Sequence, residues 1–258
     1  MKGTKDLKKT INLGHQIYFQ GLSVDCVIFG FHNFQLKVLV LKKNNLTQRA
    51  LPGGFIYKNE NVDDAATRIL QERTGLDHIF LQQFRVFGDP RRSKKPSHIL
   101  GIMKAEGIKV DKKNWLLQRF VTVGYYALVE YSHVTPICNH LSETFEWCDI
   151  HTLPPLIIDH REIFQKALET LRIQLNYQPV GYNLLPEKFT MPELQKLYET
   201  ILDKKLDRRN FQRKMLGFGI LNKLKEQRKG VAHKAPFLYT FNLKKYHKAL
   251  REGWYGGW

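Results

Sequence analysis

Four side chains that can read DNA bases cluster in the C-terminal third of the chain, at Arg208, Arg209, Gln212 and Arg213. Arginine and glutamine pair bidentately with the edges of guanine and adenine in the major groove. The stretch that begins at Leu206-Asp207 has the apolar spacing of a helix, with Asp207 as its N-cap. The four side chains share one side of that helix near its N-terminal half, which is the half of a recognition helix that reads bases.

The elements expected around this helix are those of a winged helix-turn-helix domain at residues 181–248. A capped helix at residues 191–201 precedes it, and strands at residues 220–226 and 237–242 follow it. Within the recognition helix, the spacing points three apolar side chains inward: Phe211, Met215 and Leu216. The basic loop between the strands is expected to form a wing, with Lys229 and Lys234 near phosphates.

The charge distribution agrees with a polyanionic partner. The 258 residues contain 41 Lys and Arg against 24 Asp and Glu, a net charge of +17. Residues 181–258 hold 17 of these basic residues against 7 acidic ones, so this third of the chain has a net charge of +10. Such a surplus points to nucleic acid or to an anionic membrane surface. A basic surface without a partner is the other interpretation.

The N-terminal part has the element order of an α/β/α sandwich with a mixed sheet, which we expect to end near residue 176. Residues 176–181 form the natural linker, and residues 92–118 are a polar, Lys-rich stretch expected to be a surface insertion. The predicted strands lie at residues 23–31, 35–43, 79–87, 120–131 and 144–150, and the predicted helices at 61–74 and 159–175.

Five residues around the first of these helices follow a fixed spacing: Gly54, Glu60, Arg68, Glu72 and Gly75. This spacing resembles the Nudix box, GX5EX7REUXEEXGU, in which U is aliphatic. In that family, three glutamates of the REUXEE segment lie on one helix face and hold divalent metals that bridge a diphosphate and polarise the attacking water. The resemblance also implies that Glu60 and Arg68 form an ion pair that braces the loop against the helix.

Two of the three metal-binding positions depart from the Nudix pattern. They are occupied by Ile69, which offers no oxygen ligand, and by Arg73, which places a permanent cation where the metal would bind. Only Glu72 keeps a carboxylate. We therefore expect no enzyme activity, no metal and no cofactor, while the concave face beside the helix can still bind a ligand.

The two halves together resemble the Nudix-related transcriptional regulators, in which a Nudix domain precedes a winged helix. The segments that carry this resemblance include SVDCVIFGF, FGDPRR, VGYYALV, LPPLIIDHREI and GYNLLPEKFTMPELQKLYETILDKKLDRRNFQRKM. Within the family, the box is most similar to the sugar-responsive, arabinose-type bacterial regulators of Bacteroidetes. The resemblance covers residues 18–248, with a sensing domain at 18–176, and departs at the insertion and at the aromatic tail Trp254–Trp258.

This resemblance implies a dimeric regulator that binds double-stranded operator DNA and a small-molecule effector, either a sugar or an ADP-ribose-like compound. The candidate effector-binding residues are Asp25, Gly54, Phe55, Phe87, Tyr126 and His160. Asp25 lies in an apolar strand, where an acid binds either a ligand hydroxyl or a buried backbone group. Tyr125 and Tyr126 alternate across a strand, so only one of them can face a pocket.

Two other functions fit parts of the sequence. An active Nudix hydrolase acting on ADP-ribose or another nucleoside diphosphate derivative is disfavoured by Ile69 and Arg73. An RNA-binding module is disfavoured because the outward side of the recognition helix carries no aromatic side chain for base stacking. The three cysteines (Cys26, Cys138 and Cys148) are scattered and, with His140, lack the spacing of a zinc site. These cysteines and the absence of a long apolar run lead us to expect a cytoplasmic protein with no membrane partner.

Overall fold

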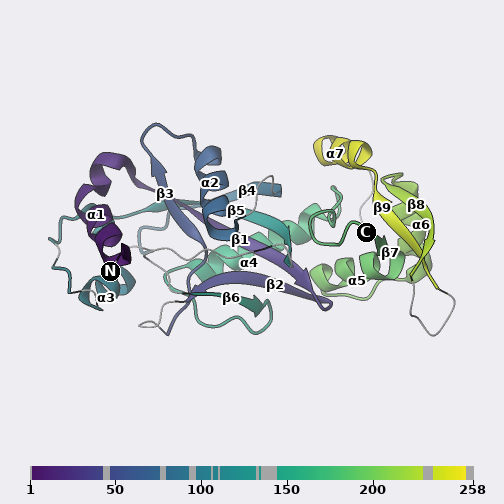
Figure 1. Cartoon of the computed structure of the whole chain (residues 1–258), viewed down its shortest axis with the longest axis horizontal. Coiled ribbons are helices and arrows are strands. Elements are labelled where there is room, and N and C mark those ends of the chain that lie inside the picture. The colour runs from purple at the N-terminus through teal and green to yellow at the C-terminus, as the bar shows by residue number, and fades with distance from the viewer. Residues whose placement is uncertain are drawn as a thin grey trace. The chain divides into compact units, whose positions relative to one another are not determined.

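A computed structural model describes residues 2–42, 47–75, 80–92, 97–105, 107–109, 111–131, 134, 144–228 and 235–253. The chain forms two compact units (Figure 1). The first unit contains most of residues 1–167. The second contains residues 168–258 together with the short segments 30–36 and 129–132.

A six-stranded sheet is the centre of the N-terminal part, with strand order β4-β5-β1-β2-β6 and with β3 paired to β1. Strands β1 and β2, at the positions of the first two predicted strands, form a hairpin. Its two turn residues, Asn33 and Phe34, have φ angles of 48° and 60°, as a tight turn between right-twisted strands requires. The strands are β1 (Tyr18–His32), β2 (Gln35–Lys42), β3 (Gly53–Tyr57), β4 (Phe80–Phe87), β5 (Val121–Glu130) and β6 (Thr144–Asp149).

Two helices cover opposite faces of this sheet, α2 (Val62–Thr74) and α4 (His160–Gln174). Tyr125 and Tyr126 are consecutive in β5, so their side chains point to opposite faces. The Tyr125 hydroxyl donates a hydrogen bond to Asp63 of α2. The Tyr126 ring packs on Phe29, whose ring also contacts Phe164 of α4. The predicted α/β/α sandwich is therefore confirmed.

The N-terminal helix and the insertion fold together around one hydrophobic cluster. The elements are α1 (Lys2–Ile17), α3 (Ser97–Ala105) and the 3-10 helix η1 (Trp115–Leu117). Ile11 of α1 is buried with Ile102, Met103, Trp115 and Leu116 of the insertion. The indole of Trp115 also donates a hydrogen bond of 3.1 Å to the Thr10 carbonyl. The expectation of a polar surface insertion is wrong for these residues, because they are buried against α1. The sequence pattern did not reveal that helix.

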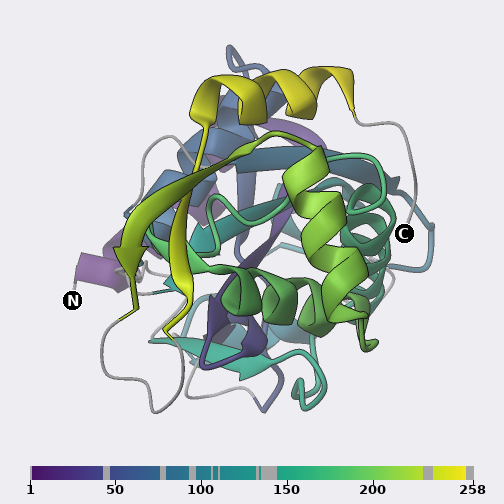
Figure 2. The same ribbon diagram turned by 90° about the vertical axis from the view of Figure 1, so that its right-hand side faces the viewer.

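The C-terminal unit contains a three-stranded sheet of order β7-β9-β8 and the helices of a winged-helix domain (Figure 2). Phe211 and Met215 of the second helix are buried as predicted. Leu216 is 43% exposed, so its predicted inward orientation is wrong; the helix ends at the next residue, and only the i, i+4 pair faces the core. The elements are β7 (Phe189–Thr190), α5 (Met191–Leu202), α6 (Arg208–Gly217), β8 (Leu221–Gln227), β9 (Phe237–Phe241) and α7 (Leu243–Glu252).

Among the described residues, no helix is both long enough and apolar enough to cross a lipid bilayer.

Candidate functional site

An ion pair braces the loop before α2 against the helix. Arg68 Nε and Nη2 donate to the two carboxylate oxygens of Glu60 at 2.7 and 2.8 Å. The same Nη2 donates to the Phe55 carbonyl at 2.9 Å, and Glu60 accepts a further bond of 3.0 Å from the Tyr57 amide. The hydrogen bond from Arg68 lowers the pKa of Glu60, so this carboxylate is charged at neutral pH. The pair holds the loop in place.

The first substituted box position is filled by hydrocarbon. Ile69 is 1% exposed, and its side chain lies against Gly54. A Cβ placed on Gly54 would lie 3.0 Å from Ile69 Cδ1, which leaves no room for a larger residue in the loop without movement of the isoleucine. At this position an apolar contact between loop and helix replaces a carboxylate oxygen.

The second substituted position carries a buried cation. Arg73 is 6% exposed, and its Nη2 donates to the Gly53 carbonyl at 3.1 Å. The remaining carboxylate of the set, on Glu72, is half-exposed and accepts a bond of 3.2 Å from Arg68. No group of three or more His, Cys, Asp or Glu side chains that could hold a metal occurs among the described residues. Because a hard divalent cation needs several oxygen ligands, the residues at this site do not fit it.

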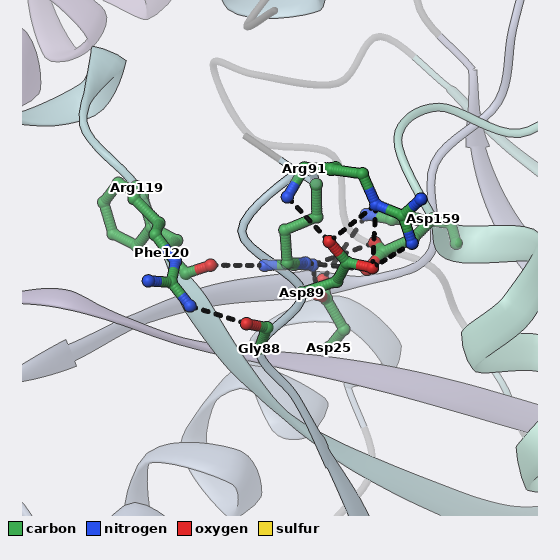
Figure 3. Close-up of polar contacts among 9 residues, drawn as sticks. Asp25, Gly88, Asp89, Arg91, Arg119, Phe120 and Asp159 are labelled. Atoms are coloured by element: carbon green, nitrogen blue, oxygen red, sulfur yellow. Dashed lines mark hydrogen bonds and ion pairs between the residues drawn. The ribbon is translucent and has the colours of Figure 1, made fainter. Parts of the chain in front are cut away.

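A second polar cluster lies on the α4 side of the sheet, around the Asp25, Phe120 and Asp159 that Figure 3 labels. Arg92 is at its centre. Arg92 Nε and Nη2 donate to the two carboxylate oxygens of Asp159 at 2.7 and 3.0 Å, and Nη1 donates to the Phe120 carbonyl at 3.1 Å. Asp25 Oδ2 lies 3.6 Å from Nη2. The Arg92 side chain is only 4% exposed. The acid that the sequence placed in an apolar strand is therefore paired with a buried arginine, which the sequence analysis did not identify.

His160 completes this cluster as a neutral imidazole. Its Nδ1 accepts a hydrogen bond of 2.9 Å from the Leu51 amide, so that nitrogen carries no proton. Nε2 lies 3.8 Å from Asp25 Oδ1. Burial lowers the pKa of His160, although the charges of Asp25 and Asp159 oppose the shift. Asp25 and His160, two of the six candidate effector-binding residues, thus lie together.

Two exposed arginines lie at the rim of the cluster in Figure 3. The Arg91 side chain is 80% exposed and donates to both carboxylate oxygens of Asp89. Arg119 is exposed and donates to the Gly88 carbonyl at 2.6 Å. Arg91, in the loop after β4, and Arg119, just before β5, therefore present exposed guanidinium groups beside the buried network, and guanidinium groups suit an anionic ligand.

The other four candidate effector-binding residues do not form one group. Phe87 and Tyr126 both pack against the Phe84 ring and are almost fully buried in the core. Gly54 lies against Ile69 of α2. Phe55 belongs to a separate aromatic cluster with Tyr18, Trp115 and Phe120. Of the residues weighed for zinc, Cys138 and His140 lie outside the described residues, and Cys148 is a buried free thiol.

The DNA-reading residues named from the sequence are all exposed on α6. Asp207 caps the helix by accepting a bond of 2.9 Å from the Asn210 amide. Arg213 donates to the Asn210 side chain at 2.9 Å. The side chains of the others make no hydrogen bond within the described part of the chain, so they are available to a partner: Arg208, Arg209 and Gln212.

The base of the wing is fixed by Arg228, which directly follows β8. Arg228 Nη2 donates to both carboxylate oxygens of Glu193, each at 2.6 Å. Glu193 also completes the capping box of α5 with Thr190. Arg228 thus ties the end of β8 to the start of α5. Lys229 and Lys234 lie outside the described residues.

Comparisons with known proteins agree with this division into two parts. Residues 20–167 match the NUDIX domain, and residues 181–241 match the NrtR DNA-binding winged helix domain. The chain is 30% identical over 233 residues to the ADPR responsive transcriptional repressor NtrR of Acinetobacter baylyi, covering 87% of this chain and 83% of the relative.

Solved structures show the same architecture. The crystal structure of Shewanella oneidensis NrtR complexed with a 27mer DNA has a TM-score of 0.71 and 26% identity, and the match covers 93% of this chain and 100% of the other. A MutT/nudix family protein from Enterococcus faecalis shares the fold, with a TM-score of 0.61 and 22% identity over 92% of this chain and 93% of the other. These matches confirm the predicted fold class but give no support to an arabinose-type specificity. The chain belongs to the family of Nudix-related transcriptional regulators in which a Nudix domain is followed by an NrtR DNA-binding winged helix domain.

Proposed function

We propose that this protein is a repressor that binds operator DNA through α6 and responds to ADP-ribose through its Nudix domain. The observation that carries the proposal is the exposed set of base-reading side chains on α6, within a domain that matches a DNA-binding winged helix. The relative from Acinetobacter baylyi is described as an ADPR responsive repressor. The Shewanella oneidensis NrtR structure contains DNA. A sugar effector finds no support among these relatives.

The Nudix domain acts in this proposal as a sensor without hydrolase activity. Ile69 and Arg73 remove two of the three carboxylates that would hold metal, and Glu72 is paired with Arg68. We expect no phosphate-containing product from ADP-ribose with Mg²⁺ or Mn²⁺. Turnover on the order of 1 per second, ordinary for an enzyme, would show that the domain is a hydrolase.

ADP-ribose is expected to bind this domain without added metal. Its diphosphate is an anion that the exposed guanidinium groups of Arg91, after β4, and Arg119, before β5, can pair with. Calorimetry in EDTA, with ADP-ribose and L-arabinose as separate ligands, tests the assignment. Binding of arabinose but not of ADP-ribose would reverse it.

We also propose a homodimer, because two copies of a recognition helix match the two halves of a palindromic operator. Sedimentation equilibrium of the full chain measures the mass directly. A monomer at concentrations that saturate operator DNA would rule this assembly out.

The DNA-binding assignment is tested by substitutions on α6. Arg209→Ala or Gln212→Ala should cost about 1–3 kcal/mol on operator DNA and much less on a random duplex, because these side chains would contact bases. Lys229→Ala should weaken both duplexes equally and reduce the salt slope by about one unit, as loss of a phosphate contact does. Fluorescence anisotropy on operator DNA obtained by in vitro selection measures both effects. Equal losses on both duplexes for the α6 variants would show that this helix does not read bases.

A further inference from the structure

Helix α7 lies outside the matched winged-helix domain, which ends at residue 241. One side of α7 is firmly anchored within the C-terminal unit. Tyr246 is 5% exposed; its ring packs on Phe241, with centroids 5.1 Å apart, and its hydroxyl donates to the Pro179 carbonyl at 3.1 Å. Gln178 donates to the Leu250 carbonyl at 3.0 Å. This helix is therefore a fixed element of the unit.

The opposite side of α7 is cationic and exposed. Lys244, Lys248 and Arg251 follow an i, i+4, i+7 spacing, which places them in one stripe facing away from Tyr246. The acid near this stripe is Glu252, whose carboxylate lies 3.7 Å from Lys248 Nζ while both side chains remain more than 60% exposed. An exposed pair of this kind holds its partners only weakly. The stripe keeps its positive charge available.

The start of α7 adjoins the end of the recognition helix. Asn242, the N-cap of α7, donates its amide to the Ile220 carbonyl at 2.8 Å, directly after the turn that ends α6. Lys245 Nζ lies 3.9 Å from the position that a Cβ of Gly219 would occupy. Figure 2 shows α7 beside the end of α6 from which β8 begins. Helix α7 therefore begins next to the C-terminal end of α6.

We propose that α7 is a second DNA-contacting element, whose Lys244, Lys248 and Arg251 bind backbone phosphates that flank the bases read by α6. DNA is the expected partner of this stripe because their charges are complementary. A row of exposed cations next to a base-reading helix matches the row of phosphates on the same duplex. Such contacts fix position and add affinity without adding sequence preference. This inference rests on the proposed function, because it presupposes that α6 binds operator DNA.

The test compares two triple variants with the same change in charge. K244Q/K248Q/R251Q removes the stripe, and K58Q/K112Q/K113Q removes three exposed lysines of the N-terminal part. Anisotropy titrations over a salt series should show that the α7 variant loses affinity by the same factor on operator and scrambled duplexes. Its salt slope should fall by about two to three units for each bound protomer, at roughly 0.9 per phosphate contact. The control should bind like the wild type.

Duplex length sharpens the test. On a duplex trimmed to the bases that α6 reads, the wild type and the α7 variant should bind equally, because the flanking phosphates are missing. Each single variant, K244Q, K248Q and R251Q, should lower the salt slope by about one unit, at roughly 0.9 per contact. Circular dichroism melts confirm that the variants are folded.

Three results would overturn the inference: an α7 variant with the wild-type salt slope, a control that loses as much affinity, or a loss confined to one sequence. Unchanged DNA binding with loss of binding to phosphatidylserine vesicles would assign the stripe to a lipid surface instead. A wild-type chain that binds no DNA at all would contradict the proposed function, which distinguishes that failure from failure of the α7 contact.

Discussion

Helices α2 and α6 both carry charged side chains at helical spacing, but they use these side chains differently. In α2, Arg68 binds Glu60 and Glu72, and Arg73 binds the Gly53 carbonyl. In α6, Arg208 and Arg209 make no side-chain hydrogen bond within the described residues. Charges satisfied within the fold serve stability, whereas exposed charges at similar spacing are available to a partner. The spacing of charged residues on a helix therefore does not by itself assign them a role; the partners of their side chains do.

The largest effect is expected where the internal pairing is most buried. Arg92→Ala should lower the free energy of unfolding by about 3–5 kcal/mol, because it leaves the carboxylates of Asp25 and Asp159 without their buried cation. Urea denaturation measures the change. Arg91→Ala is the matched control, since the neighbouring arginine is 80% exposed and should change stability by less than about 0.5 kcal/mol. Equal effects of the two substitutions would contradict the network described here.

A smaller loss of stability is expected from a substitution in α2. Arg68→Ala should cost about 1.5–3 kcal/mol of stability, the range for hydrogen bonds to charged groups, because Glu60 loses both of its bonds to the guanidinium. Its affinity for a random DNA duplex should not change. Denaturation and anisotropy on the same samples test both statements. A stable Arg68→Ala protein with weakened DNA binding would break the distinction between α2 and α6.

The opposite result is expected for a substitution in α6, where operator affinity should change and stability should not. Arg209→Ala should leave the free energy of unfolding within about 0.5 kcal/mol of the wild-type value, because an exposed side chain without internal partners contributes little to stability. Its effect should appear only in operator affinity. A cooperative unfolding transition shifted by more than that amount would mean that Arg209 has a structural role.

The last expected effect is a dependence of stability on pH. Burial lowers the pKa of His160 in the folded state below its ordinary value of 6.5. The unfolded chain therefore takes up a proton first as the pH falls, so stability should decrease below about pH 6.5, by at most about 1.4 kcal/mol per pH unit. His160→Asn keeps an acceptor for the Leu51 amide and should remove this slope between pH 7 and 5. An unchanged slope would show that another group titrates.

Local pattern was enough to predict most of the elements. Strands β1, β2 and β5 and helices α2, α4, α5 and α6 follow from apolar spacing, caps and turn residues, because these signals lie within each segment. Helix α1 did not follow, since Ile11 is the one large apolar side chain buried among residues 8–17, and its partner Trp115 lies about a hundred positions away. Helix α7 was not predicted either, although Leu243, Tyr246 and Leu250 recur at helical spacing; of these three, only Tyr246 is buried.

The candidate site also has parts that the sequence predicted and parts that it did not. The exposed face of α6 could be identified by helical spacing, and the Glu60–Arg68 pair by the resemblance to the Nudix box, because each depends on one helix and the residues next to it. The Arg92 network could not, since it joins β1, the loop after β4 and the start of α4 through buried charges 67 positions apart. A nonlocal pairing of this kind leaves no trace in local periodicity.

The coupling between ADP-ribose binding and DNA binding is measured as operator affinity with and without ADP-ribose, in EDTA to exclude metal. ADP-ribose should weaken operator binding, and operator DNA should weaken ADP-ribose binding by the same factor, because the coupling between two binding sites is reciprocal. L-arabinose should change neither value. An operator affinity that stays constant at saturating ADP-ribose would contradict the account of this chain as an ADP-ribose-responsive repressor.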